Sequence, residues 1–366
     1  MTKKLLFKAV GIIPPKQGNY IQGIGRSNIE LLKNFIKIND PDIELHLYCN
    51  SDVRPSYNYD EWKGVIPTHK YLLPHHLGLI CNIEPLWRKH IVKYDLLHIT
   101  ANFDRVDKNE NFVVTIHDLA RYKLSPWWQK IFRQSAERAR GIITDAEYTK
   151  NEVAEFFNIN ESKITSIHLG ISQEVFYQRT EEHVSLLSKK LNIPQKYFFS
   201  CSCAHPRKNA KDILAAFELF AREDKECGLV LAWSNPPVEL TSKYKSLMDE
   251  ERLIFLDFVN DDELATLYSG ALASFLVSSL EGFGFPILES MACGTNCITC
   301  KNTSMTELGA DKAYWVEEHN VEDIANAMLH FAKNGKGDVL PLVEYAKTFT
   351  WENTARKYID FYKKYM

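Results

Sequence analysis

The sequence of 366 residues lacks any run of about 18 consecutive apolar residues, the length that a helix needs to span a bilayer. Residues 1–11 have two lysines before a short apolar stretch, and Lys8 interrupts that stretch. The segment is too short and too interrupted for a secretory signal peptide, so we interpret residues 5–13 as a first buried strand. We therefore predict that the chain has no membrane span and no leader segment.

A strong excess of charge of one sign is also missing. The 44 Lys and Arg residues nearly balance the 47 Asp and Glu residues, which gives a formal net charge of −3. Such a balance provides no overall attraction to nucleic acid or to an anionic membrane. We therefore predict that nucleic acid is not a partner.

Cysteines are few in the predicted loops. The eight cysteines fall mostly within predicted strands and helices, a placement that favours reduced thiols in a cytoplasmic protein over a disulfide framework. Five of them invite comparison with a zinc site: Cys201, Cys203, Cys293, Cys297 and Cys300. This group lacks a second pair with the spacing of a zinc knuckle, so we predict buried small side chains and no bound metal.

The chain is long for one domain and suits two of about 150 to 200 residues each. Segments with strand character alternate with segments of helical periodicity along its length. This alternation predicts an α/β protein with two doubly wound parallel sheets. We expect a first domain over residues 1–177, a polar linker over residues 178–190 and a second domain over residues 191–345.

The most informative stretch is residues 273–294, which begins as a buried strand and enters a helix at Pro286. Between strand and helix lies a short loop that contains Gly282 and Gly284. A glycine loop lets a ligand approach the backbone closely, and a helix N-terminus presents N–H groups with a partial positive charge. The pattern predicts a binding site for an anion.

Two carboxylates belong to the same stretch, Glu281 in the loop and Glu289 one turn into the helix. A carboxylate in contact with a phosphate repels it, but a carboxylate accepts hydrogen bonds from sugar hydroxyls. A nucleotide-sugar fits both features, because ribose and sugar hydroxyls flank its diphosphate. The alternative is a helix N-terminus with ordinary acidic residues in its first turns.

Glu281 and Glu289 have seven residues between them, with Gly-Phe-Gly-Phe-Pro in that interval and Met-Ala-Cys-Gly after it. This arrangement resembles the E-x7-E signature of the retaining glycosyltransferases of family 4. The resemblance implies the GT-B fold, in which two Rossmann-like doubly wound domains face each other across an interdomain cleft. It also implies that a C-terminal helix, here within residues 346–366, crosses back to the first domain.

Two cations precede the helix that we predict at residues 210–220. Arg207 and Lys208 lie at a strand-to-helix turn, where their charge adds to the helix dipole and suits a diphosphate leaving group. The segment Pro-Arg-Lys-Asn is similar to a family segment whose lysine binds the donor diphosphate. Some relatives carry an arginine at the position of Cys203. In this chain we expect Arg207 to take the place of that arginine.

Two segments of the first domain also resemble the family. Gly23 and Gly25 are interpreted as a loop that the family places against the diphosphate across the cleft; the alternative is a plain chain reversal. The apolar run of a predicted strand over residues 112–119 stops at His117 and Asp118, and the family's histidine at this place touches the transferred sugar. The alternative is a strand-end histidine that caps a nearby backbone group. Relatives often carry serine at the position of Asp145, so no role is assigned to it.

The resemblance implies a role for most of these residues, with His117, Lys208 and Glu281 as the catalytic ones. The donor sugar would contact His117, Glu281, Gly282 and Phe283. The diphosphate would contact Gly23, Gly25, Arg207, Lys208, Gly284 and Phe285. The ribose would contact Glu289, and the base would lie beside Phe258 and Val259. Residues 303–309 are interpreted as a loop that closes over the sugar. We expect no cofactor and no metal, because fixed cations and helix dipoles replace them.

The predicted function is transfer of a hexose from a nucleotide-diphosphate sugar, with GDP-mannose or a UDP-sugar as the expected donor. The acceptor would be a glycan or a lipid-linked precursor in the synthesis of a cell-surface polysaccharide or glycoconjugate, with Arg121 and Tyr122 positioning it. Residues 127–140 predict an amphipathic basic helix that allows peripheral contact with the inner face of a membrane; the alternative is a helix whose aromatic side packs inward. Two other functions fit the same architecture, a nucleotide-sugar epimerase and a non-catalytic sugar-nucleotide binding protein.

Overall fold

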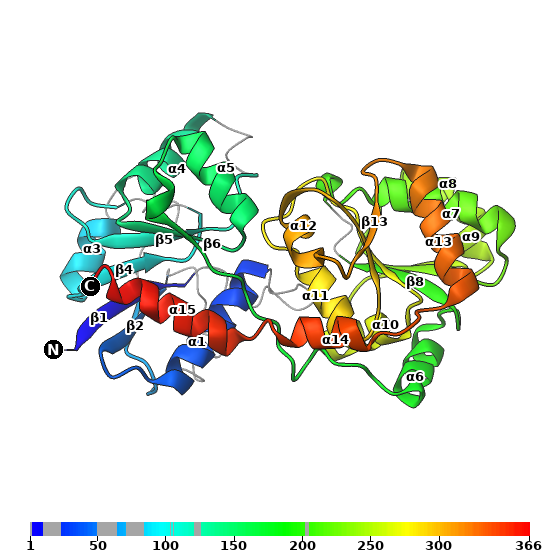
Figure 1. Cartoon of the computed structure of the whole chain (residues 1–366), viewed down its shortest axis with the longest axis horizontal. Coiled ribbons are helices and arrows are strands. Elements are labelled where there is room, and N and C mark those ends of the chain that lie inside the picture. Colours follow the sequence, from blue (N-terminus) through cyan, green and yellow to red (C-terminus); the bar gives the residue numbers. More distant parts are fainter. Residues whose placement is uncertain are drawn as a thin grey trace. The chain divides into compact units, whose positions relative to one another are not determined.

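The computed structural model of the chain describes residues 2–9, 23–49, 64–70, 84–102, 104, 106–120, 126–201 and 205–366. The chain divides into two compact units. The first unit consists of residues up to Gly170 together with Trp351–Met366, and the second consists of Ile171–Thr350. Each unit is an α/β structure with helices packed around a sheet (Figure 1).

The first unit contains a seven-stranded sheet. Its strands follow in the order β3 (Thr68–Lys70), β2 (Ile43–Cys49), β1 (Lys3–Lys8), β4 (Leu96–Ile99), β5 (Phe112–Ile116), β6 (Gly141–Thr144) and β7 (Ile164–Ser166). Neighbouring strands are parallel throughout. The order reverses between β1 and β4, which makes this a doubly wound sheet.

The second unit repeats the arrangement with six strands. Their order is β10 (Leu253–Leu256), β9 (Gly228–Ala232), β8 (Tyr197–Cys201), β11 (Ser274–Leu276), β12 (Cys297–Cys300) and β13 (Tyr314–Val316). All pairs are again parallel, and the order reverses between β8 and β11. The two sheets confirm the prediction of two doubly wound parallel sheets.

Helices connect the strands, since parallel neighbours need a crossover. The first unit has α1 (Gly23–Ile38), α3 (Glu84–Ile91), α4 (Pro126–Arg138), α5 (Glu147–Phe157), the 3-10 turn η3 (Glu161–Lys163) and α15 (Trp351–Lys363). The second has α6 (Glu181–Leu191), the 3-10 turn η4 (Pro206–Lys208), α7 (Ala210–Glu223), α8 (Val238–Lys243), α9 (Lys245–Asp249), α10 (Asp261–Gly270), α11 (Phe285–Ala292), α12 (Thr303–Gly309), α13 (Val321–Asn334) and α14 (Leu340–Lys347). None of the described helices combines the length and the apolar character that crossing a bilayer needs.

The central strands of the first sheet are buried on both faces. Every residue of β4, β5 and β6 is buried, which matches their nearly uninterrupted apolar sequences. Side chains from different elements form one core there, including Leu6, Leu97, Val114, Phe132 and Ile142. This core fixes where the strands end, and with them the loops at the carboxyl edge.

The last helix, α15, belongs to the first unit although it follows the second unit in sequence. It packs beside α1 (Figure 1), and Tyr358 and Tyr362 of α15 are buried. The hydroxyl of Tyr362 forms a hydrogen bond of 2.8 Å with Nδ1 of His98 in β4. The C-terminal helix therefore returns to the first unit as predicted, and it begins at Trp351.

Residues 178–190 were predicted as a linker, but most of them form helix α6. Oγ1 of Thr180 caps the helix by accepting from the backbone N–H of His183 at 3.4 Å. Acidic residues occupy its first turn and lysines its last turn, which complements the helix dipole. Leu187 is buried. The polar sequence therefore reflects the exposed face of a packed helix, and the second unit already begins at Ile171.

Among the described residues, five cysteines are free thiols: Cys201, Cys227, Cys293, Cys297 and Cys300. All except Cys201 are buried. Burial, as the main cause, raises the pKa of each of these four thiols to about 12. These four thiols behave as small apolar side chains. This burial was predicted from the sequence for Cys293, Cys297 and Cys300.

A cluster of charged side chains is buried beside the end of β1. Lys8 forms ion pairs with Glu84 and Asp104, and Arg88 pairs with Glu110 at 2.9 Å. All five side chains are at most 6% exposed. Burial lowers the pKa of Lys8, but the charges of Asp104 and Glu84 outweigh burial and raise that pKa above its usual value. The carboxylates depend on their cations, because an unpaired buried charge is strongly destabilising.

Replacing Lys8 by methionine should lower the free energy of unfolding by about 3–5 kcal/mol, because two buried carboxylates lose one of their two cations and keep only the longer contacts to Arg88. Lys37→Met is a matched control: Lys37 pairs with Glu352 at the surface and its side chain is 72% exposed, so its loss should cost less than about 1 kcal/mol. Urea unfolding followed by circular dichroism measures both variants. Equal losses would show that the buried cluster is not needed.

Candidate active site

The carboxyl ends of β8 and β11 meet where the strand order of the second unit reverses. In doubly wound sheets this switch point is where ligands bind. The connection after β8 contains η4 with Arg207 and Lys208, and the connection after β11 contains Glu281. The switch point therefore brings together two segments that lie far apart in the sequence.

Hydrogen bonds fasten these two connections to each other. The backbone N–H of Ser279 donates to the carbonyl of Arg207 at 2.8 Å. The side-chain amide of Asn209 donates to the carbonyl of Val277 and to Oγ of Ser279, both at 2.9 Å. Asn209 has a left-handed backbone with a φ of 51°, which asparagine adopts more readily than most residues. This one residue ends η4, precedes α7 and holds the neighbouring loop.

Lys208 and Arg207 form ion pairs with Glu281. Nζ of Lys208 lies 2.5 Å from Oε1, and Nη1 of Arg207 lies 3.4 Å from Oε2. The side chains of Lys208 and Glu281 are only 12% and 8% exposed, so water screens their attraction weakly. The sequence assigned Lys208 to the diphosphate and Glu281 to the sugar. The structure places these two side chains in contact.

Helix α12 holds the other side of the loop that contains Glu281. Oγ of Ser304 donates to the carbonyl of Glu281 at 3.0 Å and to that of Phe283 at 2.8 Å. The side-chain amide of Asn302 donates to the carbonyl of Ser278 at 3.2 Å. The prediction that residues 303–309 form a loop was wrong. They form a helix whose first turn anchors the Glu281 loop.

Helix α11 begins directly after Gly284, whose φ of 108° is accessible mainly to glycine. Pro286 lies in its first turn, and the N-cap residue Gly284 has no side chain. A helix N-terminus is a position that suits an anion. The rings of Phe283 and Phe285 pack edge to face with centroids 5.1 Å apart. Together with Gly282 they form the turn between Glu281 and the helix.

Glu289 lies one turn into α11 and is 4% exposed. Glu289 lies close enough to Tyr268 to affect its titration. Burial mainly, and then the nearby Cys201 and Glu289, raise the pKa of Tyr268 well above its usual value.

The two residues predicted to border the base follow β10 and differ in burial. Phe258 is 51% exposed, whereas Val259 is 2% exposed, so the phenyl ring is accessible to a ligand and the valine supports the loop.

In the first unit, His117 follows β5 at the carboxyl edge of the sheet. Its Nδ1 lies 2.6 Å from Oδ2 of Asp145, and its Nε2 lies 3.1 Å from the carbonyl oxygen of Thr100. Its backbone N–H donates to Oδ1 of Asn102 at 2.7 Å. Burial by itself lowers the pKa of His117, but the charge and hydrogen bond of Asp145 outweigh burial and raise that pKa to about 9.

Asp145 is the residue of this site to which sequence reasoning gave no role. It follows β6, and β6 pairs with β5, the strand that leads to His117. Parallel neighbours end at the same edge of a sheet, so the two strand ends predict the contact once their pairing is known. Ser304, Asn302 and the anchoring role of Asn209 were also missed, because their contacts link separate loops.

Gly23 and Gly25 were predicted in a loop, but both lie in the first turn of α1. Their backbone therefore belongs to a helix N-terminus, a position that also suits an anion. Helix α1 is connected to His117 through Thr100. Nδ2 of Asn28 donates to Oγ1 of Thr100 at 2.9 Å, and the carbonyl of Thr100 accepts from the histidine ring.

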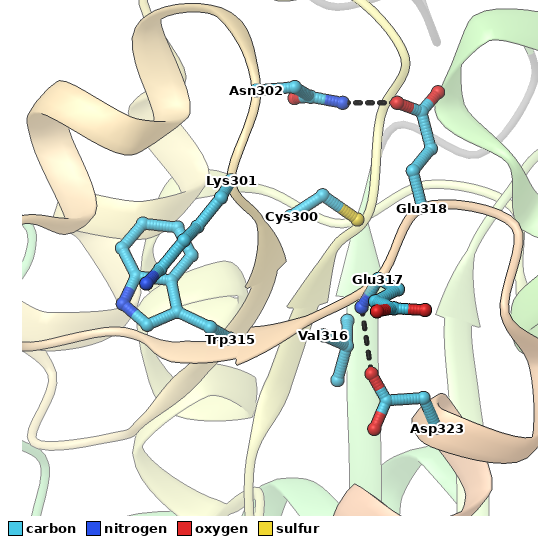
Figure 2. A pocket seen from close by; sticks show the side chains of 8 residues that line it. All are labelled: Cys300, Lys301, Asn302, Trp315, Val316, Glu317, Glu318 and Asp323. Carbon is cyan, nitrogen blue, oxygen red and sulfur yellow. Dashed lines mark hydrogen bonds between the residues drawn. The ribbon is translucent and has the colours of Figure 1, made fainter.

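A cavity of about 380 Å³ opens at the carboxyl ends of β12 and β13 (Figure 2). It is lined by Cys300, Lys301, Asn302, Trp315, Val316, Glu317, Glu318 and Asp323. Three of these side chains are carboxylates, and Lys301 lies across the ring of Trp315, with Nζ 5.6 Å from the ring centroid. Such a lining disfavours a diphosphate, and neither Lys208 nor Glu281 belongs to it.

Some predicted features lie outside the described residues. They are Arg121, Tyr122, Cys203 and the side chains of Trp127 and Trp128. In the described part of α4, Arg133 pairs with Glu137 at 3.3 Å, and Arg138 donates to the carbonyl of Val106 at 3.2 Å. Two of the basic side chains in residues 127–140, Arg133 and Arg138, therefore bind partners within the first unit.

Two sequence families match most of the chain between them. Residues 21–175 match the family described as Glycosyltransferase Family 4, and residues 185–348 match Glycosyl transferases group 1. O-antigen chain mannosyltransferase B from Escherichia coli is 25% identical over 285 residues, which cover 74% of this chain and 74% of that protein. Serotype-specific mannosyltransferase WbdA from Escherichia coli is 27% identical over 68% of this chain, but the match spans only 33% of WbdA.

Solved structures resemble the whole chain. Alr3699/HepE from Anabaena, in complex with UDP and glucose, has a TM-score of 0.77 and 16% identity, and the match covers 100% of both chains. Sucrose-phosphate synthase from Thermosynechococcus elongatus has a TM-score of 0.74 and 17% identity, with 99% of this chain and 98% of that chain covered. At such identities the likeness establishes the fold.

The two doubly wound units and these structural matches define the GT-B fold, as predicted. The chain belongs to the group 1 glycosyltransferases of the family 4 type. It is therefore a glycosyltransferase enzyme.

Asn209 allows a test of how the two loops of the second unit are held together. Asn209→Ala removes the hydrogen bonds to Val277 and Ser279 and should lower the free energy of unfolding by about 2–4 kcal/mol, part of which is backbone strain. Asn235→Ala is the control, because Asn235 is exposed and has a similar φ of 52°. The side-chain amide of Asn235 donates to the neighbouring Ser234 in an exposed hydrogen bond, so the loss in this variant should be mainly the strain contribution of about 1–2 kcal/mol. Identical losses in urea unfolding would mean that the bonds between the loops contribute nothing.

Proposed function

We propose that this enzyme transfers a hexose, with retention of configuration, from a nucleotide-diphosphate sugar to a hydroxyl of a glycan or lipid-linked acceptor during polysaccharide or glycoconjugate synthesis. The observation that carries the proposal is the pairing of Lys208 and Arg207 with Glu281 at the switch point of the second unit. It combines, in one shielded place, cations for a diphosphate and a carboxylate for sugar hydroxyls.

The comparisons support a nucleotide-sugar donor and a glycan product. The relatives from Escherichia coli are named as mannosyltransferases, one of them of the O-antigen chain. HepE was solved with UDP and glucose and also with UDP-glucose. GDP-mannose and UDP-hexoses are therefore the first donors to test. A thermal-shift panel of GDP-, UDP- and dTDP-sugars ranks them, because a bound ligand stabilises the folded state by mass action.

The charges around Glu281 indicate how the donor binds. A diphosphate that contacts Lys208 replaces Glu281 as the partner of the cation, and the released carboxylate then accepts hydrogen bonds from the sugar hydroxyls. The helix N-terminus that follows Gly284 adds backbone dipoles to the same anion. On this proposal Glu289 binds the ribose, and Phe258 and Val259 border the base. No metal is required for charge compensation.

The reaction breaks the bond between C1 of the sugar and a phosphate oxygen, and it forms a bond between C1 and the acceptor oxygen on the same face. The proton of the acceptor hydroxyl passes to the departing diphosphate, so no side chain serves as the base. The charge that develops on the diphosphate is stabilised by Lys208 and Arg207 and by the dipoles of α11 and α1. Gly23 and Gly25 belong to the first turn of α1. His117 is assigned to the sugar side of the reaction centre.

The acceptor side of the proposal concerns the first unit. Arg121 and Tyr122 are proposed to position the acceptor, and residues 127–140 are proposed to allow peripheral membrane contact if the acceptor is linked to lipid. Release of nucleoside diphosphate that depends on an added acceptor identifies a transferase. An epimerase would instead convert the donor without any acceptor, and a binding protein would release nothing.

Lys208→Ala should lower turnover by about a hundredfold or more, because the departing diphosphate loses a cation that stabilises the transition state. Lys211→Ala is the matched control: Lys211 is exposed and lies three residues further along, in α7. It should keep turnover close to that of the wild type. Acceptor-dependent release of nucleoside diphosphate measures both variants. Wild-type turnover in Lys208→Ala would remove this lysine from the mechanism.

Glu281→Gln should lower transfer by about a hundredfold, because the sugar loses the carboxylate that positions it. Binding of the free nucleoside diphosphate should stay as strong or become stronger, since Lys208 and Arg207 lose the anion that now pairs with them. Isothermal titration calorimetry with the free nucleotide separates the two effects. Weaker nucleotide binding would contradict the assignment of Glu281 to the sugar.

A further inference from the structure

The imidazole ring of His117 lies between two hydrogen-bond acceptors. Oδ2 of Asp145 is 2.6 Å from Nδ1, and the carbonyl oxygen of Thr100 is 3.1 Å from Nε2. A backbone carbonyl can only accept, so Nε2 must bear a hydrogen. An ionised carboxylate also only accepts, so Nδ1 bears a hydrogen as well. A ring with hydrogen on both nitrogens is an imidazolium cation.

The surroundings of Asp145 favour this charged form. Its side chain is 3% exposed, and its Oδ1 is buried without a hydrogen-bond partner among the described residues. A neutral ring would leave this buried carboxylate without the charge of its partner, which is strongly unfavourable. The proton between the two groups stays on nitrogen, because an imidazole is a stronger base than a carboxylate.

The other groups that face the ring leave its charge in place. Asp118, in the same loop, adds a negative charge that favours the cation. Burial mainly, and then the charge of His117, lower the pKa of His98 in β4 to about 3, so His98 is neutral. Burial mainly, and then Asp145, raise the pKa of Tyr358 in α15 above its usual value, so this hydroxyl is neutral too.

We propose that Asp145 is a positioning residue that holds His117 as a fixed imidazolium cation, oriented from both sides by Asp145 and Thr100. The catalytic consequence rests on the proposed function. An imidazolium has no lone pair, so His117 is excluded as the base that takes the acceptor proton. It instead supplies a positive charge at the reaction centre without any rearrangement during the reaction.

The pair also links stability to pH. The pKa of His117 is raised to about 9 in the folded protein, above the value of about 6.5 for an unperturbed histidine. The folded state therefore holds a proton that the unfolded state releases. This stabilisation is complete below about pH 6.5 and is lost as the pH rises through about 9. Asp145→Asn should remove this part of the pH dependence.

The first measurement uses no substrate. Nitrogen-15 NMR of histidine-labelled protein, with His117→Gln to assign the signal, should show both ring nitrogens protonated at pH 7.5 and deprotonation near pH 9. In Asp145→Asn, which preserves shape and removes the charge, the ring should titrate at about pH 6.5 or lower. Asp118→Asn is the matched control. Asp118 accepts from the N–H of Ala120 at 3.1 Å, and its removal should shift the titration less.

The second measurement is the pH profile of sugar transfer. At pH 7.5, Asp145→Asn should be at least about tenfold slower than the wild type, because a ring with a pKa of about 6.5 is then about one tenth protonated. Its rate should recover toward that of the wild type at pH 5.5. A residue with a purely structural role would lose activity equally at both pH values. Circular dichroism at both pH values verifies that the variant is folded.

Three results would overturn the proposal: titration of wild-type His117 near pH 6.5, an unchanged titration in Asp145→Asn, or a rate that fails to recover at low pH. If Asp145→Asn does not fold, the titration of the wild-type ring still decides. Failure of the proposed function gives a different result. The wild type would then transfer no sugar from any donor, which removes the catalytic role, while the NMR titration still decides whether the ring is held as a cation.

Discussion

The ion pair between Lys208 and Glu281 is the contact on which the arrangement of the second unit's candidate site depends. It exists because parallel pairing of β8 and β11 places their carboxyl ends side by side. Asn209 then ties one loop to the other, and Ser304 fixes the Glu281 loop from the opposite side. A charged pair held in a shielded place by several hydrogen bonds loses little freedom when a ligand arrives, which favours binding and catalysis.

The first unit applies the same geometric rule to a different pair of side chains. There β5 and β6 are parallel neighbours, and His117 and Asp145 follow their carboxyl ends. Each unit thus places an acid against a cation at the edge where strands end. In the second unit the cation is a lysine, Lys208, which pairs with Glu281. In the first unit it is a histidine, whose charge is maintained by the carboxylate beside it.

Sequence reasoning predicted the sheets well and some local elements badly. Apolar runs such as Phe112–Ile116 are long enough to identify buried strands, and they do so in both units. Helix α6 was missed because its polar residues outnumber the few that pack inward. Gly23 and Gly25 were taken for a loop because glycine is a poor helix former. The structure nevertheless places both residues in the first turn of α1.

The sequence by itself determined the family, the two doubly wound sheets and the residues that have the chemistry for a diphosphate and a sugar. These follow from local spacing, because a strand, a glycine turn and a helix start are encoded within about twenty residues. Only the tertiary structure decided that Glu281 pairs with Lys208, that Ser304 and Asn209 anchor its loop, and that Asp145 charges His117. Those contacts join strand ends far apart in the chain, and strand order, which places them together, is a property of the folded sheet.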